Sequence, residues 1–370
     1  MVLMNVELSN IYGFENFKLN FSYPRRLTNT TIEGEYLKER PNFKYKKAVI
    51  LMGANATGKT TLGKALMGIF NYMVNGNPAS VLELVGDRKK EAKFSVDFVN
   101  TVQLNLIRFT TTIKPTSSRI PATSGIECFY SSCDIRPADS YESCIKQIEG
   151  KTLMPVQPSG FLSVFGRNGF RFCLSGQQSL VDVAVSQKKE TFLETLKCII
   201  QTLDPSFSSV SESKEFKDSF VLKRGDTQIL IQKGVIQDNR GILSTGTREG
   251  VSIAILVAAI RQHLNGFYYC DEQFSHIQTD IEKRLFGIMV GSLGDGEQLI
   301  FTSHNSDMQD MNLPKHTFVY LRKVKEDGLF NIYASSASDY LKRPTDSVRC
   351  AAENDVFSTI PDDSLLDLID

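Results

Sequence analysis

Residues 53–60, with the sequence Gly-Ala-Asn-Ala-Thr-Gly-Lys-Thr, have the composition of a loop that binds phosphate groups. They fit the pattern GxxxxGK(S/T) without a mismatch. Glycines let the backbone wind around phosphate oxygens with N–H groups pointing inward, and a following helix N-terminus adds partial positive charge. Lys59 would reach the β and γ phosphates, and the Thr60 hydroxyl would bind Mg²⁺. The predicted nucleotide contacts are Gly53, Asn55, Ala56, Thr57, Gly58, Lys59, Thr60 and Thr61.

Two adjacent carboxylates, Asp271 and Glu272, follow an apolar run and could handle a metal ion and a water molecule. Asp271 can hold Mg²⁺ and its waters, and Glu272 can polarise an attacking water as a general base. Another apolar run leads to His304, where an imidazole can contact a γ phosphate. Because these groups come after a phosphate loop, we predict Glu272 and His304 as catalytic residues, and Asp271 with Thr60 as metal ligands.

A further segment, Leu243-Ser244-Thr245-Gly246, stands immediately before a helix that the sequence predicts from about Arg248 to Leu264. A small hydroxyl residue and a glycine at a helix N-terminus make a second anion site. Ser244 and Gly246 are therefore candidate nucleotide contacts. The same residue types also form ordinary helix caps, so this segment alone leaves both interpretations open.

Short buried strands must carry these side chains to one place. The apolar run 48–52 is typical of a strand buried on both faces, and it leads straight into the phosphate loop. After the loop, apolar residues recur at helical spacing, which predicts a helix that ends near Asn75-Gly76. The runs 267–271 and 299–303 predict two more core strands, each followed by a candidate functional residue.

The other segments predict an antiparallel β part and a partly helical insertion. We expect a hairpin at 2–9 and 16–22, antiparallel strands over 93–114, loops over 115–180, a helix at 187–203 and two strands over 218–233 that meet near Gly225-Asp226. These elements predict one domain, 1–370, in three parts: a β subdomain with the phosphate loop (1–114), an inserted helical and loop region (115–240), and a part with the remaining functional segments and C-terminal strands (241–370).

The composition is that of an ordinary water-soluble globular protein. Among 370 residues, 42 Lys and Arg balance 42 Asp and Glu, so the molecule as a whole has no field that attracts nucleic acid or an anionic membrane. The N-terminus alternates like a strand and lacks the pattern of a signal peptide. The longest apolar run, 251–260, is about half the length of a membrane span. We expect a cytoplasmic protein without a membrane partner.

These segments together resemble the ABC-ATPase superfamily. In this resemblance GANATGKT is the Walker A motif, LSTGT a variant of the LSGGQ signature, FYYCDE the Walker B motif and FTSH the switch-histidine segment. Residues 275–280 take the D-loop position but depart from the usual SALD form, and no Q-loop glutamine is identified. The resemblance implies an α/β P-loop fold with a mixed central sheet, an N-terminal antiparallel β subdomain and a helical signature subdomain.

The resemblance also implies ATP and Mg²⁺ as cofactors, ATP hydrolysis, and a homodimer or higher homo-oligomer. In the superfamily the signature of one subunit caps the nucleotide that another subunit holds, so Ser244 and Gly246 would meet the γ phosphate in the partner's loop. Neither copy would then have a whole site.

Within that superfamily the chain looks more like the RecF, SMC and OLD branch than like transporter subunits. The features are the opening LSNIYGFENFKLNFS, the form GANATGKT, the signature LSTGT in place of LSGGQ and the C-terminal LKRPTDSVRCAAENDVF. The AAA15 group of bacterial ATPases is the most similar group, over nearly the whole chain. Its members commonly act in anti-phage defence, as in PARIS, Septu-like and retron-linked systems, beside a separate effector that is often a TOPRIM-type nuclease. The chain shows no long heptad arms, and we expect the segment after Ser306 to be too short for a nuclease domain.

Two other functions remain open from the sequence. A RecF-like ATPase clamp for DNA repair would need a basic groove, for which the candidates are Arg88, Lys89, Lys90, Arg167 and Arg171. A nucleotide-gated scaffold would bind ATP and hydrolyse it slowly. The acidic C-terminal segment, which contains several leucines, is either a solvated tail or a docking segment for a basic partner.

Overall fold

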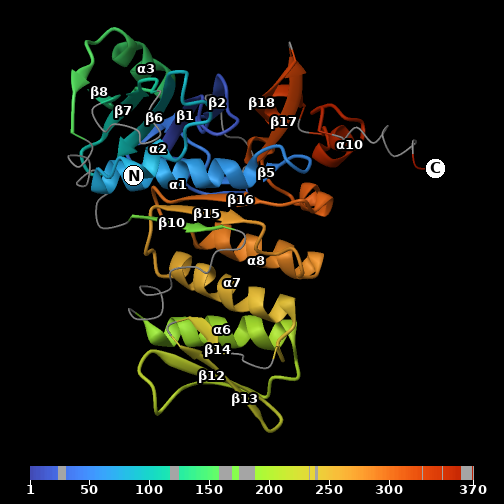
Figure 1. Cartoon of the computed structure of the whole chain (residues 1–370). Coiled ribbons are helices and arrows are strands. Elements are labelled where there is room, and N and C mark those ends of the chain that lie inside the picture. Colours follow the sequence, from blue (N-terminus) through green and yellow to red (C-terminus); the bar gives the residue numbers. More distant parts are fainter. Residues whose placement is uncertain are drawn as a thin grey trace.

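The structure, a computed structural model, describes the chain except residues 24–30, 117–124, 158–168, 175–187, 233, 238–240, 327, 344, 360–368 and 370. Its elements form layers (Figure 1). An antiparallel sheet lies above helix α1 (Lys59–Asn75), and a mixed sheet lies below α1. Further helices and a small antiparallel sheet follow on the other side of the mixed sheet.

The antiparallel sheet forms the N-terminal part of the molecule. Its strands, in spatial order, are β2 (Phe17–Asn20), β1 (Val2–Ser9), β6 (Ala92–Asn100), β7 (Asn105–Ile113), β8 (Ile126–Asp134) and β9 (Met154–Pro155). The pairing of β1 with β2 and of β6 with β7 is antiparallel, which confirms the hairpin and the strands predicted for these segments. A short helix, α2 (Ala79–Leu82), follows α1, and a separate strand pair is formed by β3 (Tyr36–Leu37) and β4 (Arg40–Lys44).

The mixed sheet carries the candidate functional residues. Its strands, in spatial order, are β10 (Phe170–Cys173), β15 (Phe267–Asp271), β16 (Gln298–Thr302), β5 (Ala48–Met52), β17 (Phe318–Glu326) and β18 (Leu329–Ser336). Neighbouring strands from β10 to β17 are parallel, and only β18 is antiparallel to its neighbour. All five residues of β5 are buried, as the apolar run predicts.

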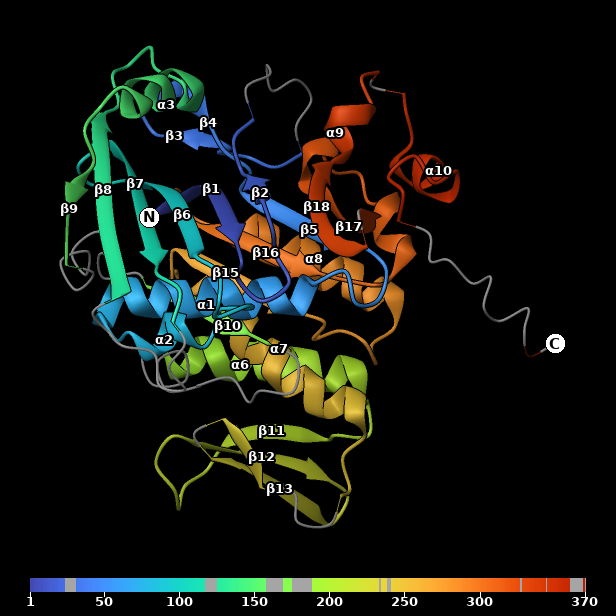
Figure 2. The ribbon, with the colours of Figure 1, turned by 45° about the horizontal axis from the view of Figure 1, so that its top comes forward.

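Three helices lie on the side of the mixed sheet opposite α1, and a small sheet lies beyond them (Figures 1 and 2). The helices are α6 (Lys189–Leu203), α7 (Thr245–Arg261) and α8 (Thr279–Ser292). The small sheet consists of β11 (Ser209–Glu212), β12 (Ser219–Arg224), β13 (Thr227–Gln232) and β14 (Val235–Gln237). The C-terminal part adds η3 (Ser306–Asp310), η4 (Lys315–Thr317), α9 (Ala337–Tyr340) and α10 (Val348–Glu353).

The mixed sheet separates two hydrophobic cores. Along β5, Val49 and Leu51 pack into the core around α1, whereas Ile50 and Met52 pack into the core around α6, α7 and α8. Strand β15 alternates in the same way, with Tyr269 on the α1 side. Burying such side chains stabilises the fold by about 1.5–3 kcal/mol each. The strands are therefore held from both faces, and their carboxyl ends form a rigid edge.

The prediction of a loop-rich section over 115–180 is wrong for the part of it that the structure describes, because this part contains a long strand and a helix. Strand β8 pairs with β7 along its whole length, and α3 (Tyr141–Glu149) begins with the N-cap Ser140. The Tyr141 hydroxyl donates to Asp97 Oδ2 at 2.6 Å, and the Arg108 guanidinium also binds this carboxylate. These contacts join segments that are far apart in the sequence, so a local composition rich in serine did not reveal them.

The predicted start of the signature helix is also corrected. We expected the helix from about Arg248, but α7 begins at Thr245 and ends at Arg261. The reason is that Ser244 is its N-cap, so the next residues already belong to the first turn. No helix in the described ranges has both the length and the hydropathy that crossing a bilayer would need.

The fold class is that predicted from the sequence. The mixed central sheet carries the phosphate loop, an antiparallel sheet occupies the N-terminal side, and α7 follows the signature segment in a partly helical layer. This arrangement places the carboxyl ends of β5, β15 and β16 at one edge of the sheet.

Candidate nucleotide site

The candidate site lies where three parallel strands end side by side. In the register of the sheet, Asp271 pairs with Thr302, and Thr302 pairs with Leu51. Each strand then releases its chain at the same edge: β5 into the loop 53–58 and β16 into the segment 303–305. Crevices at the carboxyl ends of strands are the usual ligand sites of open α/β sheets. The fold thus brings the predicted segments together.

The loop 53–58 has the backbone shape of an anion cradle. Gly53, Ala56 and Gly58 all have positive φ, at 148°, 61° and 98°. A Cβ on Gly53 would lie 2.4 Å from the Leu321 carbonyl oxygen, so only glycine fits there. Successive residues in such conformations turn their N–H groups toward a common centre. Asn55 and Ala56 are exposed at the outer side of the loop, and the side chain of Thr57 folds back onto Ala54 O at 2.8 Å.

The start of α1 leaves its amides without a side-chain cap. Gly58 is the N-cap residue and provides no side chain, and the first turn contains no acidic residue. The first amides of a helix have no partner within the helix, so they need an external acceptor. Thr60 and Thr61 lie in this first turn and are partly buried. The helix start therefore suits a bound anion.

Lys59 is buried and points into the loop. Its side chain is only 4% exposed, and Nζ donates to Gly53 O at 2.9 Å and to Ala54 O at 3.3 Å. Burial lowers the pKa of Lys59, and the nearby carboxylates of Glu272 and Asp271 oppose that shift. The ammonium is thus held at the mouth of the cradle, with backbone carbonyls as its partners.

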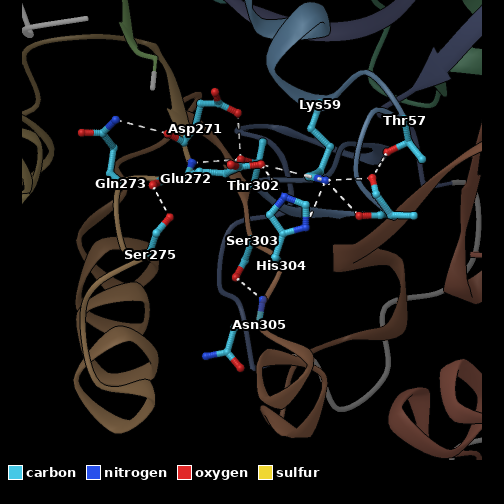
Figure 3. A network of polar contacts seen from close by, with 12 residues as sticks. Thr57, Lys59, Asp271, Glu272, Gln273, Ser275, Thr302, Ser303, His304 and Asn305 are labelled. Atoms are coloured by element: carbon cyan, nitrogen blue, oxygen red, sulfur yellow. Dashed lines mark hydrogen bonds and ion pairs between the residues drawn. The ribbon is translucent and has the colours of Figure 1, made fainter. Parts of the chain in front are cut away.

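Lys59, Glu272 and His304 form one polar cluster, seen close by in Figure 3. Lys59 Nζ lies 3.4 Å from His304 Nδ1 and 3.9 Å from Glu272 Oε1, and His304 Nε2 lies 2.7 Å from the same Oε1. Because an ammonium can only donate, Nδ1 is the acceptor. The ring proton is therefore on Nε2, which donates to Glu272. Three predicted functional side chains meet here, one from the start of α1 and two from the segments after β15 and β16.

Thr302 binds the turn that carries the two adjacent acidic residues. Its hydroxyl donates to Asp271 Oδ1 at 2.9 Å, and its oxygen accepts from the Glu272 backbone N–H at 3.0 Å. Asp271 is fully buried, whereas Glu272 is about a quarter exposed and has a φ of 50°. A positive φ is uncommon for a residue other than glycine and stores strain at functional sites. The turn after β15 thus directs Asp271 inward and Glu272 toward Lys59.

Tyr269 fixes helix α1 against the sheet. Its hydroxyl donates to the Lys59 backbone carbonyl at 2.6 Å, and burial raises its pKa well above the usual value. A Cβ on Gly63, one turn further along α1, would lie 2.7 Å from the Tyr269 ring. The close approach sets the height of Lys59 above β15. Tyr269 and Thr302 were not predicted to serve the site, although both lie in the quoted strand motifs.

Ser244 and Gly246 lie elsewhere in the molecule. Ser244 is exposed, and its Oγ accepts from Thr247 N at 3.1 Å as the cap of α7. A Cβ on Gly246 would lie 2.8 Å from His276 O, so the signature turn packs tightly on the D-loop position. Among the described contacts, none joins Ser244 or Gly246 to residues 53–60. One copy of the chain therefore brings together the loop, the carboxylates and His304, but not the signature.

The residues present fit a nucleotide triphosphate with Mg²⁺. The cradle, the uncapped helix start and the Lys59 ammonium supply positive potential for phosphates. The buried Asp271 carboxylate and the Thr60 hydroxyl at the same edge are the hard oxygen donors that Mg²⁺ prefers. A pocket of about 420 Å³ opens beside Glu272 and His304. By its chemistry, this arrangement suits a phosphate group in the cradle with a carboxylate beside it.

Comparisons with known proteins identify the fold. No family profile and no curated protein matches the chain. Among solved structures it is similar to an SMC head bound to the C-terminal winged-helix domain of ScpA, with 16% identity, a TM-score of 0.55 and coverage of 93% of this chain and 100% of that chain. It is also similar to an SMC head with an extended coiled coil, bound to the C-terminal domain of ScpA derived from Pyrococcus furiosus, with 13% identity, a TM-score of 0.53 and coverage of 92% and 98%. The chain therefore has the ABC-type ATPase fold of SMC heads.

Proposed function

We propose that this protein binds ATP with Mg²⁺ and hydrolyses it in sites that two copies of the chain complete. The observation that carries the proposal is the cluster of Lys59, Glu272 and His304 at the mouth of the loop 53–58. The similarity of the fold to solved SMC heads supports it. The position of Ser244, away from the loop in its own chain, supports a composite site.

Each residue of the cluster has a task that follows from its chemistry. The loop amides and Lys59 bind phosphate oxygens. Thr60 and Asp271 would hold Mg²⁺, which would supply positive charge to the phosphates. Glu272 accepts the proton of the attacking water, and its strained turn aims the carboxylate toward Lys59. His304 holds the Glu272 carboxylate through Nε2. In the partner, Ser244 and Gly246 present the start of α7 to the γ phosphate.

Replacing Glu272 by Gln tests the proposal most directly. The amide retains the size of the carboxylate and can still accept a hydrogen bond from His304, but it is no base. We expect ATP turnover to fall about 10²–10⁴-fold while ATP binding persists, so that ATP holds the variant as a dimer. Turnover is measured by phosphate release, and mass by light scattering with and without ATP.

The control variant is Lys59→Ala, which should weaken ATP binding itself and prevent the dimer. The scaffold alternative makes a different prediction, because a protein that barely hydrolyses ATP would hardly respond to Glu272→Gln. If turnover is equally slow in the wild type and in Glu272→Gln, and both form a dimer, the result would support the scaffold hypothesis and contradict the enzyme hypothesis.

We also propose that the ATP state of the dimer controls a separate effector protein, a TOPRIM-type nuclease, in bacterial anti-phage defence. What supports this role is the sequence resemblance in the segments LSTGT and LKRPTDSVRCAAENDVF, together with a site whose described residues are those of an ATPase alone. The expected result is that a protein encoded beside this chain co-purifies with it, and that Glu272→Gln with ATP changes the amount bound. Full anti-phage activity of this chain without any neighbouring gene would contradict the role.

The structure weakens the alternative of a RecF-like DNA clamp. Arg171, one of its candidate contacts, is buried on β10 and donates to Asn265 Oδ1 at 3.2 Å. Arg88, Lys89 and Lys90 are exposed in the turn before β6, and Arg167 lies outside the described residues. ATP turnover that does not respond to added DNA, at low as well as high salt, would remove this alternative.

A further inference from the structure

We propose that Glu282 on α8 is a positioning residue for hydrolysis, because its carboxylate binds the residues on both sides of His304 and so fixes the imidazole against Glu272. The inference rests on the proposed ATPase function. It adds to that function a residue that lies in no motif recognised in the sequence, and it assigns a task to the contact between α8 and the segment after β16.

The geometry is a two-point clamp. Glu282 Oε1 accepts from Ser303 Oγ at 2.9 Å, and Glu282 Oε2 accepts from Asn305 Nδ2 at 2.7 Å. Ser303 Oγ in turn accepts from the Asn305 backbone N–H at 3.0 Å. Figure 3 shows Ser303 and Asn305 directly next to His304, on the side away from Lys59. A single carboxylate thus binds the side chains of the residues before and after the histidine.

The clamp connects the D-loop position to the histidine. Asn305 Nδ2 also contacts Thr279 Oγ1 at 3.1 Å, and Thr279 is the first residue of α8. Glu282 lies in the first turn of the same helix. Both residues line the 420 Å³ pocket that also borders Glu272 and His304. The path from α8 to the catalytic pair is therefore short and made of hydrogen bonds.

Burial of Glu282 makes the loss of either hydrogen-bond donor costly. Glu282 is only 3% exposed, and burial raises its pKa, while the bonds from Asn305 and Ser303 oppose that shift. A buried carboxylate that loses a donor pays its desolvation in full, so the arrangement with both donors is strongly preferred. His304 itself is 41% exposed. Its position then depends on the backbone that Glu282 fixes.

The primary test compares Glu282→Ala and Glu282→Gln with the wild type. The alanine removes both acceptors, and we expect kcat to fall about 10–100-fold, the range seen when an outer partner of a site ligand is lost. KM for ATP should change less than about threefold, because Lys59 and the cradle are untouched. Glutamine keeps the shape and one acceptor for Ser303, so we expect a smaller loss in kcat and a folded protein.

A matched control separates positioning from general stability. Glu297 is also a buried carboxylate, accepts from Gly294 N at 2.7 Å and faces His263 at 3.2 Å, but it precedes β16 at the opposite end. Glu297→Ala should lower the unfolding temperature as Glu282→Ala does and leave kcat near the wild-type value. Equal losses of kcat in both variants would assign Glu282 a purely structural role.

Non-additivity identifies the residue through which Glu282 acts. If the clamp works through His304, Glu282→Ala should reduce kcat much less in a His304→Gln background than in the wild type. The loss of thermal stability should be the same in both backgrounds. A full additional loss of kcat in the double variant overturns the proposal.

NMR of the histidine rings measures the effect of Glu282 on His304 independently of hydrolysis. The chain has four histidines, so the signal of His304 is assigned as the one that His304→Gln removes. The wild type should show the Nε2–H tautomer, and Glu282→Ala a mixture of tautomers. If the wild type does not hydrolyse ATP, the proposed function fails. The comparison of the His304 tautomer in the wild type and in Glu282→Ala still shows whether Glu282 positions the imidazole. An unchanged His304 signal in Glu282→Ala refutes the clamp even in an active enzyme.

Discussion

At the scale of single residues, Lys46 shows how burial of one charge can set the pH response of the fold. It is 6% exposed and lies two residues before β5. Burial lowers its pKa from 10.5 to about 8, and the carboxylates of Asp339 and Glu35 oppose that shift. The folded state thus releases a proton that the unfolded chain keeps up to about pH 10.5. Stability from this group therefore rises with pH between about 8 and 10.5.

The variant Lys46→Met makes this contribution measurable. Below pH 8 the wild type must hold a buried ammonium, so the variant should be more stable, by ~3 kcal/mol at most for 2.5 pKa units (10.5 − 8). The advantage should vanish as the pH approaches 10.5. Urea unfolding at pH 7.5 and pH 10 checks the difference. Lys18→Met is the control, since Lys18 is 60% exposed beside Glu7 and its replacement should have the same small effect at both pH values. A destabilised Lys46→Met at pH 7.5 would contradict the sign.

Residue types identify much of the candidate site from the sequence, but not the hydrogen bonds that position its side chains. The spacing of GxxxxGKT and the paired acids after an apolar strand locate Lys59, Asp271 and Glu272, because these residues follow the chemistry of phosphate and metal directly. The bridging hydroxyl of Thr302 and the clamp at Glu282 are different. Their partners, Asp271 and Ser303, come from other elements, and only the register of β15 and β16 and the position of α8 bring them into contact.

At the scale of elements, local patterns predict those helices and strands whose ends have their own signals. Helix α1 ends at Asn75, and Gly76 is its C-cap with a φ of 67°, as the Asn-Gly pair indicates. Strands β12 and β13 meet at Gly225-Asp226, and β5 is a continuous apolar run. In each case the residues that stop the element are adjacent to it, so a single sequence contains the whole signal.

Elements that depend on distant partners were not predictable in this way. Strand β8 has buried and partly exposed residues in an irregular order, and its strand form depends on the nine residue pairs that it makes with β7. Helix α3 is held by the hydrogen bond from the Tyr141 hydroxyl to Asp97 in strand β6. The predicted start of α7 differs from the observed one because the sequence permits two interpretations of Ser244, as a nucleotide contact or as a helix cap. The structure shows the cap, and the nucleotide contact stays a proposal that needs a second copy.

At the scale of the whole molecule, the mixed sheet separates the two halves of the proposed site. The alternation of β5 and β15 places α1 and its loop on one face, and α7 on the other. The start of α7 is tied to the D-loop position, where Glu249 binds His276 at 2.6 Å and Gly246 packs on His276 O. A chain built this way presents its loop and its signature as two separate surfaces. Such surfaces complete each other in a symmetric pair, where each is used once by each copy.

This arrangement predicts that two inactive variants restore activity when they are mixed. Lys59→Ala destroys the loop of its own chain, and Ser244→Arg blocks the signature of its own chain. In a mixed dimer both defects fall in one site, while the other site combines an intact loop with an intact signature. Each mixed dimer keeps one of its two sites intact. Turnover should therefore reach roughly a quarter of the wild-type value if pairing is random, and roughly half if Lys59→Ala does not pair with itself.

Each variant alone must be inactive for the test to count, because every site of a pure dimer contains the defect. Circular dichroism verifies that both variants are folded, and Ser140→Arg, at the N-cap of α3 far from the site, serves as the matched surface change that should leave turnover unaffected. Recovery that grows with total protein concentration identifies association as the cause. If the mixture stays as inactive as its components while both variants still form dimers with ATP-loaded wild type, each site is complete within one chain, and the position of Ser244 at the start of α7 has no part in hydrolysis.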